Sequence, residues 1–154
     1  CIEGDGSIMM NLQELQTMVT NKLPIKLFVI NNNGYHQVRL TQNNIFHNGL
    51  VGMGPESGDL GFPDFEKLAG AFGIPYIHIN DNIGLEAGIK KALSMPSFVL
   101  CDVHISTTQK FEPKSATKKL PDGTLVSPPL EDLAPFLPRE ELKKNMYIPL
   151  LPER

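Results

Sequence analysis

The sequence has 154 residues, 41% of them hydrophobic, which is enough for one well-packed core, and length alone favours a single domain with at most a tail. The net charge is −3, from 14 basic and 17 acidic residues without strong clustering, which disfavours a nucleic-acid-binding surface. Two cysteines, Cys1 and Cys101, are too few for a disulfide framework, and no apolar run approaches the roughly eighteen residues of a membrane span. These features predict a globular protein in a reducing, cytoplasmic setting.

The start of the chain is unusual for a glycine-rich turn. Only Cys1-Ile2-Glu3 precede the turn at Gly4-Asp5-Gly6, whereas such a turn normally follows a strand. Three residues leave no room for that strand. We therefore expect the sequence to be a piece of a longer protein.

The first predicted helix follows Ser7. Apolar residues recur there at helical spacing, and the helix is expected to end near Asn21 because Pro24 disfavours helical backbone in the residue before it. Residues 25–30 form a short, nearly all-apolar run, which predicts a central strand covered on both faces. Three asparagines and Gly34 end this strand.

The next segments alternate in the same way. A helix-capable stretch at residues 36–42 precedes a glycine-rich loop at 43–61, whose length is typical of functional or mobile loops. Pro63-Asp64 begins a helix that Gly73 can end, and residues 76–79 form a second strand. Asp81 or Asn82 can cap a further helix ending before Pro96, and residues 97–103 form a third strand.

This alternation predicts an α/β fold in residues 1–104, with a parallel sheet flanked by helices on both faces. Composition changes after Val103, since eight of the thirteen prolines lie between Ile105 and Arg154. Residues 105–154 are therefore expected to form a proline-rich, irregular arm with one short helix near residues 139–145. Its apolar side chains, Leu150 among them, favour docking on another domain or subunit; the alternative is disorder without that partner.

Two motifs are expected to meet at the carboxyl ends of neighbouring strands, where open parallel sheets bind ligands. Asp5 and Asn32 offer the oxygen ligands that a hard divalent cation takes, and the backbone N–H groups of Gly6 and Ser7 can face an anion. Magnesium usually takes several of its oxygens from phosphates, so the motifs predict a magnesium-diphosphate site.

A nicotinamide nucleotide site is the less favoured alternative. The turn reads Gly4-Asp5-Gly6-Ser7, without the Gly-x-Gly-x-x-Gly pattern of dinucleotide sites. An aspartate aimed at a pyrophosphate would repel it unless a cation lay between them.

The same residues resemble a known family. Gly4-Asp5-Gly6, then the twenty-four residues 7–30, then Asn31-Asn32 resembles the thiamine diphosphate motif. The similarity continues through residues 11–15 and 63–65 to the strand ending at Val103. The sequence is similar to the C-terminal, diphosphate-binding domain of acetolactate synthase-like enzymes.

The resemblance implies a role for each motif residue. Asp5, the Asn32 side chain and the Gly34 carbonyl would bind Mg²⁺. The other cofactor-binding positions implied by the family are Gly4, Gly6, Ser7, Tyr35, Gln37 and Val38. Taken singly, Asp5 could be an ordinary turn or capping residue and residues 31–33 an ordinary polar loop; their spacing favours the cofactor site.

The resemblance also implies an activity and partners. Such enzymes are lyases or transferases that decarboxylate 2-oxoacids and join the product to an acceptor. A glutamate from a pyrimidine-binding domain, commonly on another subunit, activates the cofactor, and Glu14, Glu56 and Glu66 do not match that element. We therefore expect a homo-oligomer and no turnover by this chain alone. The alternative is a non-catalytic interaction or regulatory domain that keeps the fold.

Several positions depart from the family pattern or have open roles. Val38 stands where several 2-oxoacid decarboxylases carry glutamate, and Thr41 where branched-chain acetohydroxyacid synthases carry tryptophan. His36, beside the cofactor loop, could assist proton transfer as a catalytic residue or simply be a hydrogen-bonding loop residue. The remaining histidines are His47, His78 and His104, and the last two are expected to be structural.

Overall fold

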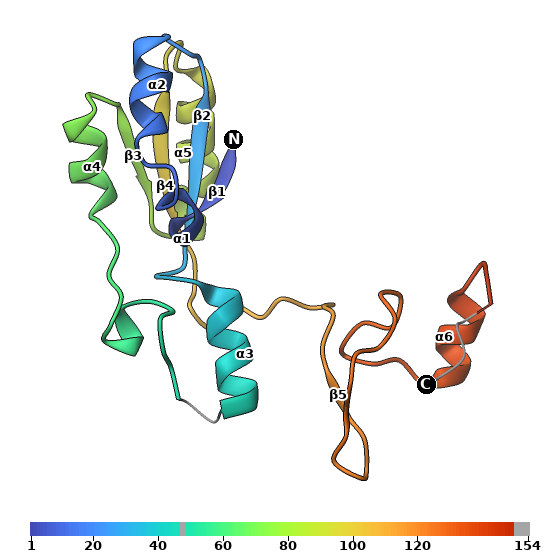
Figure 1. Ribbon diagram of the computed structural model, residues 1–154. Helices are drawn as coiled ribbons and strands as arrows, with labels where there is room; N and C mark the ends of the chain where they lie inside the picture. Colours follow the sequence, from blue (N-terminus) through green and yellow to red (C-terminus); the bar gives the residue numbers. More distant parts are fainter. Residues whose placement is uncertain (47–48, 150–154) are drawn as a thin grey trace. The chain divides into compact units, whose positions relative to one another are not determined.

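The computed structural model of the chain describes residues 1–46 and 49–149 (Figure 1). His47 and Leu150 lie outside the described residues. Contacts divide the chain into two compact units, Cys1–Thr108 and Gln109–Arg154. Each unit is described by itself.

The first unit is built on a four-stranded parallel sheet. Its strands are β1 (Ile2–Gly4), β2 (Lys26–Asn31), β3 (Tyr76–Ile79) and β4 (Val99–His104), in the spatial order β1-β2-β4-β3. The first five residues of the central strand β4 are buried, as expected for an apolar strand covered on both faces. The predicted parallel α/β sheet is confirmed.

The strand before the glycine turn corrects one prediction. Three residues were judged too few for a strand, but Ile2, Glu3 and Gly4 form β1 and pair in parallel with Phe28, Val29 and Ile30. The pairing is extended by Cys1, whose carbonyl accepts a 2.9 Å hydrogen bond from the Phe28 N–H. Three residues are enough for a strand here because each of them pairs with a residue of the longer neighbouring strand β2.

Helices cover both faces of the sheet. The helices α1 (Asp5–Ile8), α2 (Glu14–Thr20) and α4 (Phe65–Ala71) pack on one face, and α5 (Asn82–Ser94) packs on the other (Figure 1). The chain passes from β1 to β2 and on to β3 in one direction across the sheet, and then reverses direction to reach β4. Because crossovers between parallel strands are right-handed, the helix of the reversed crossover, α5, lies on the opposite face from α4. Among the described residues, no helix combines the length and apolar character needed to cross a bilayer.

Each face has its own apolar core. Leu15, Leu27 and Leu100 belong to the cluster beneath α2 and α4, whereas Ile79 and Ala92 belong to the cluster beneath α5. Burying such side chains contributes roughly 1.5–3 kcal/mol each. The two clusters hold the strands in a fixed register and so fix where the strands end.

Helix ends follow local capping chemistry. Asp64 caps α4 by accepting hydrogen bonds from the Glu66 and Lys67 N–H groups. Of the two predicted caps for α5, Asp81 is the one observed, because its side chain accepts from the Gly84 N–H at 2.8 Å. The helix after the asparagines, α3 (His36–Phe46), extends four residues beyond its prediction, and a 3₁₀ turn, η1 (Pro55–Ser57), interrupts the glycine-rich loop.

The second unit contains more regular structure than expected. The predicted short helix is present as α6 (Arg139–Asn145), but an antiparallel hairpin of β5 (Lys118–Lys119) and β6 (Leu125–Val126) accompanies it. The turn signature Pro121-Asp122-Gly123 forms the hairpin loop, where the Asp122 carboxylate accepts from the Thr124 N–H. An ion pair between Arg139 and Asp132 anchors α6, with nitrogen–oxygen distances of 2.6 and 2.8 Å.

Candidate functional site

The predicted site residues lie in the loops that follow β1 and β2. Gly4 of β1 stands opposite Ile30 of β2, so the two strands end nearly level. Asp5, which directly follows Gly4, is thereby brought beside the loop that contains Asn32 and Gly34. The register of two parallel strands places the two motifs together, although they are distant in the sequence.

Asp5 is the centre of the site. Its side chain is buried, with 2% of the residue exposed, and its two carboxylate oxygens accept hydrogen bonds from Gly34 N–H at 2.7 Å and Gly6 N–H at 2.9 Å. Desolvation raises the pKa of Asp5, and the hydrogen bonds from Gly34 and Gly6 offset this only in part. A carboxylate that loses water in this way is stabilised by a nearby cation.

The Asn32 side chain adds a second oxygen. As placed, this oxygen faces only acceptors: the Gly34 carbonyl at 2.7 Å and Asp5 Oδ1 at 3.2 Å. Without a cation, a half-turn of the amide would satisfy both contacts, because the NH₂ group would then donate to them. With a cation, the oxygen orientation is the favourable one.

In the orientation that points its oxygen at these groups, Asn32 has the spacing of a magnesium ligand to each of the other two oxygens. Neighbouring ligands of an octahedral Mg²⁺ ion with bonds near 2.1 Å lie about 3.0 Å apart. The distances from the Asn32 oxygen to Gly34 O and Asp5 Oδ1, 2.7 and 3.2 Å, bracket that value. The donor set is a carboxylate, an amide and a backbone carbonyl, all of them hard oxygen ligands.

Gly34 can be occupied only by glycine. Its φ is +132°, and a Cβ atom there would lie 2.2 Å from the carbonyl oxygen of Met53. That carbonyl accepts a 2.7 Å hydrogen bond from the Tyr35 N–H, so the glycine-rich loop crosses directly over the site loop. The close crossing fixes the direction of the Gly34 carbonyl.

Gly6 allows a second close approach. A Cβ atom at Gly6 would lie 2.6 Å from the Tyr35 ring, so the ring rests on the backbone of the glycine turn. The Tyr35 ring also meets the edge of Phe62, with ring centroids 5.9 Å apart. The Gly6 N–H donates to Asp5. The other predicted cofactor-binding residues Ser7, Gln37 and Val38 are exposed to solvent.

Comparison with known proteins identifies the family. Residues 1–103 match the family described as "Thiamine pyrophosphate enzyme, C-terminal TPP binding domain". The chain belongs to this family. The matched region contains the whole four-stranded sheet except its last residue, His104, and ends before the second unit.

Relatives of this thiamine pyrophosphate domain include acetolactate synthases. The large subunit from Porphyra purpurea is 35% identical over 124 residues, covering 77% of this chain and 20% of the relative. The large subunit from Parasynechococcus marenigrum is 36% identical over 107 residues, covering 68% and 16%. A chloroplastic acetolactate synthase 2 from Zea mays is 36% identical over 107 residues, covering 66% and 16%. The chain therefore spans a fifth or less of the length of these relatives.

Arg39 organises the site loop and was not singled out from the sequence. It is 3% exposed, and its guanidinium donates to the carbonyls of Asn32 at 3.1 Å and Asn33 at 2.8 Å. Its Nε donates to Glu56 of η1 at 3.1 Å. In the sequence, Arg39 is only a basic residue about one helical turn after the loop, and this pattern is too common to indicate a role.

His36 lies in the same network. It is 3% exposed, and its Nδ1 lies 2.9 Å from Arg39 Nη1. Because a guanidinium can only donate, Nδ1 must accept, which leaves the proton of the neutral ring on Nε2. This geometry makes His36 a buried support for Arg39, and its catalytic role stays a prediction.

Proposed function

We propose that this chain is the cofactor-binding part of a thiamine diphosphate-dependent enzyme, acetolactate synthase-like, that decarboxylates 2-oxoacids and transfers the product to an acceptor. The observation that supports it best is that the Asn32 amide lies 2.7 Å from the Gly34 carbonyl and 3.2 Å from Asp5 Oδ1, so that its oxygen can share a cation with both. The similarity to acetolactate synthases supports the substrate class.

In this proposal the chain's residues bind and orient the cofactor. Asp5, the Asn32 amide oxygen and the Gly34 carbonyl would hold Mg²⁺, and the ion would offset the negative charge of the diphosphate. The remaining cofactor-binding positions are Gly4, Gly6, Ser7, Tyr35, Gln37 and Val38. When bound, thiamine diphosphate supplies the electron sink for breaking the bond to the carboxylate, and Arg39 keeps the metal-binding loop in one shape by holding its carbonyls.

The activating glutamate is proposed to come from elsewhere. Glu56 is engaged with Arg39, and Glu14 and Glu66 lie on the helices α2 and α4, in the first turn of each. A pyrimidine-binding domain, from another subunit of a homo-oligomer, would provide this group. The chain alone would then bind the cofactor weakly and would not turn over substrate.

The second unit is proposed to dock on another domain or subunit. It exposes several large apolar side chains, including Leu130 at 83% and Ile148 at 69%. A cytoplasmic location stays a prediction, and the maize relative is named as chloroplastic.

Calorimetry on the intact protein tests the metal site. Thiamine diphosphate should bind in the presence of Mg²⁺ and not in excess EDTA, and Asp5→Ala and Asn32→Ala should each abolish binding. At a ligand concentration a hundredfold above Kd, binding should stabilise the wild type by about 2.7 kcal/mol and leave both variants unchanged.

Matched variants separate loss of the site from loss of the fold. Asp5→Asn keeps the shape of the side chain and removes its desolvated charge, so the cofactor-free protein should stay folded while binding is lost. Glu86→Gln alters an acid whose side chain is 81% exposed and should bind normally. Magnesium-dependent binding that persists in Asp5→Asn would overturn the proposed site.

A non-catalytic module with the same fold is the second candidate. The exposed apolar side chains of the second unit, such as Leu130, favour it because they suit a partner surface. Release of carbon dioxide from a panel of 2-oxoacids by the intact, cofactor-loaded protein distinguishes the two. Cofactor binding without any turnover across the panel would favour the module.

A further inference from the structure

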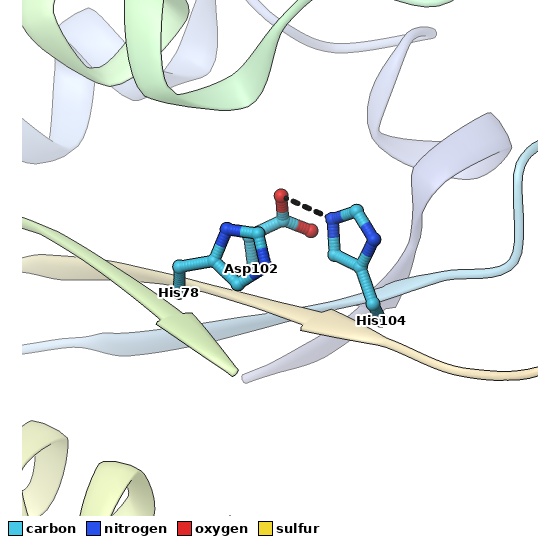
Figure 2. A group of neighbouring side chains, drawn as sticks. All are labelled: His78, Asp102 and His104. Carbon is cyan, nitrogen blue, oxygen red and sulfur yellow. Dashed lines mark hydrogen bonds and ion pairs between the residues drawn. The ribbon is translucent and has the colours of Figure 1, made fainter. Parts of the chain in front are cut away.

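A second cluster of potential ligands lies on β3 and β4. His78 of β3 stands opposite Asp102 of β4 in the parallel register, and His104 follows Asp102 by two residues on the same face of β4. The three side chains therefore project from one face of the sheet, as Figure 2 shows. Among the described residues, this is the group of histidine, cysteine and acidic side chains arranged closely enough to hold a metal ion.

The donor atoms of this cluster are close together. One ligand atom from each residue can be chosen so that all three lie within 4.8 Å of one another. His104 Nε2 is 3.1 Å from Asp102 Oδ2, and the rings of His78 and His104 stack with centroids 4.6 Å apart and an angle of 17° (Figure 2). Two imidazoles and one carboxylate thus converge on one small volume.

Asp102 is held in place by neighbouring hydrogen bonds. It is 3% exposed; Asn31 Nδ2 donates to its Oδ1 at 3.0 Å, and the Tyr76 hydroxyl donates to its Oδ2 at 2.9 Å. Supporting hydrogen bonds of this kind orient the carboxylates of metal sites.

We propose that His78, Asp102 and His104 form a binding site for a divalent transition-metal ion such as Zn²⁺. Two imidazole nitrogens and one carboxylate are a donor set that suits zinc and leaves a fourth position open to water or an anionic oxygen. His78 is exposed and the His104 side chain is 40% exposed, so the ion and that fourth ligand can reach the site from solvent.

The geometry requires one exposed ring to reorient before the ion can bind. Ligands of a tetrahedral zinc with bonds of 2.0–2.1 Å lie about 3.3 Å apart. The pair of His104 and Asp102 already has a 3.1 Å separation. Imidazole binds a metal through a lone pair in the plane of its ring, so the exposed ring of His78 must turn out of its stack on His104 to reach the same ion, whereas Asp102 is buried.

The proposed zinc site differs chemically from the magnesium site. Asp5, Asn32 and Gly34 offer only oxygen ligands, which favour Mg²⁺, whereas imidazole nitrogen favours Zn²⁺ or Co²⁺. The zinc site is therefore independent of whether the chain binds a diphosphate. An experiment can load one site without the other.

Metal titration of the intact protein tests the proposal. In buffer with millimolar Mg²⁺ to fill the oxygen site, Co²⁺ should produce the visible absorption of a four-coordinate ion at one equivalent, and Zn²⁺ should displace it. His78→Ala and His104→Ala should each weaken Zn²⁺ binding by at least about tenfold, since changes in supporting residues alone cost that much.

Controls distinguish the site from adsorption to surface groups. Asp5→Asn should bind Zn²⁺ like the wild type, because it alters only the oxygen site. Glu86→Gln removes an exposed acid and should also bind Zn²⁺ like the wild type. His78 is exposed, so His78→Ala tests the site without disturbing the core. Unchanged Zn²⁺ affinity in both histidine variants, or no binding at 100 µM Zn²⁺ (about the weakest affinity expected of a specific site), would overturn the proposal.

Discussion

The two polar clusters of the first unit are built in different ways. Asp5, Asn32 and Gly34 lie in loops beyond the ends of β1 and β2, whereas Asp102 and its two histidines lie in β3 and β4 themselves. A loop can turn a backbone carbonyl toward a ligand, the role proposed for Gly34, whose φ is +132°. A strand can present only side chains, at positions that the register fixes.

This difference decides what each cluster depends on. The oxygen cluster requires two loops to cross within hydrogen-bonding distance and is held by Arg39 and the Met53 carbonyl. The histidine cluster requires only that β3 and β4 keep their pairing, which the apolar core beneath α5 maintains. Changes in the loops should therefore affect the first cluster, and changes beneath β3 the second.

Replacing Gly34 should have the largest effect on the oxygen cluster. Gly34→Ala places a Cβ atom 2.2 Å from the Met53 carbonyl at a φ that favours glycine. Backbone strain of about 1–3 kcal/mol, with the steric overlap added, should weaken thiamine diphosphate binding by about a hundredfold. Calorimetry with Mg²⁺ measures this loss.

Gly61→Ala is the matched control. Gly61 lies in the glycine-rich loop that also contains Met53, but a Cβ atom there meets nothing within 4 Å. It should bind cofactor like the wild type, and zinc binding should be unchanged in both variants. Equal cofactor affinity in Gly34→Ala and the wild type would mean that the crossing of the two loops does not shape the site.

Replacing Gly88 should perturb β3, the strand that carries His78, from the opposite face of the sheet. A Cβ atom at Gly88 of α5 would lie 2.5 Å from the Ile79 side chain of β3. Such overpacking costs about 1–3 kcal/mol, so Gly88→Ala should lower the free energy of unfolding by that amount in a urea titration. It should weaken zinc binding more than cofactor binding.

Gly70→Ala serves as the comparison for Gly88. Gly70 is also helical, in α4, but a Cβ atom there meets nothing within 4 Å. This change should be neutral or stabilising by up to about 1 kcal/mol because alanine favours helix. If both variants had the same stability, close packing of α5 on β3 would not be a determinant of the fold.

Asn31 joins the two clusters. Its amide donates to Asp102 at 3.0 Å, and its oxygen accepts from the Asn33 N–H in the cofactor loop at 3.2 Å. Loss of a hydrogen bond to a charged group costs about 1.5 kcal/mol, so Asn31→Ala should weaken Zn²⁺ binding by about tenfold and cofactor binding by a smaller factor. Asn145→Ala, at an exposed position of α6, should change neither the Zn²⁺ affinity nor the cofactor affinity. If Asn31→Ala weakened the binding of only one of the two ligands, Asn31 would not connect the sites.

The fold was largely predictable because its signals are local. Residues 76–79 form the predicted strand, and Asp64 and Asp81 cap the helices that they were expected to begin, since apolar runs and capping side chains act over a few residues. The strand β1 was missed because its stability comes from pairing with β2, a contact that local sequence does not reveal. The hairpin of the second unit was missed because its strands have only two residues each.

The two clusters differ in the same respect. Asp5 and Asn32 could be named from the sequence because each lies in a short motif with a characteristic spacing. His78 and His104 were expected to be structural because they lie in or at the end of strand-like runs. Their proximity could not be predicted, since it depends on the pairing of β3 with β4. Arg39 was missed because its partners are backbone carbonyls, which every sequence contains.

The smallest expected effect is that of removing the Tyr76 hydroxyl. Tyr76→Phe deletes the 2.9 Å hydrogen bond to Asp102 Oδ2 and keeps the packing of the ring. Since one supporting hydrogen bond is worth about 1 kcal/mol, Zn²⁺ binding should weaken about fivefold while cofactor binding stays unchanged. Tyr147→Phe, at a fully exposed tyrosine of the second unit, should leave both affinities unaltered. A fall in cofactor affinity equal to the fall in zinc affinity would show that the two clusters respond as one site, because the proposed ligands that Tyr76 contacts, Asp102 and the edge-on ring of His78, both belong to the histidine cluster.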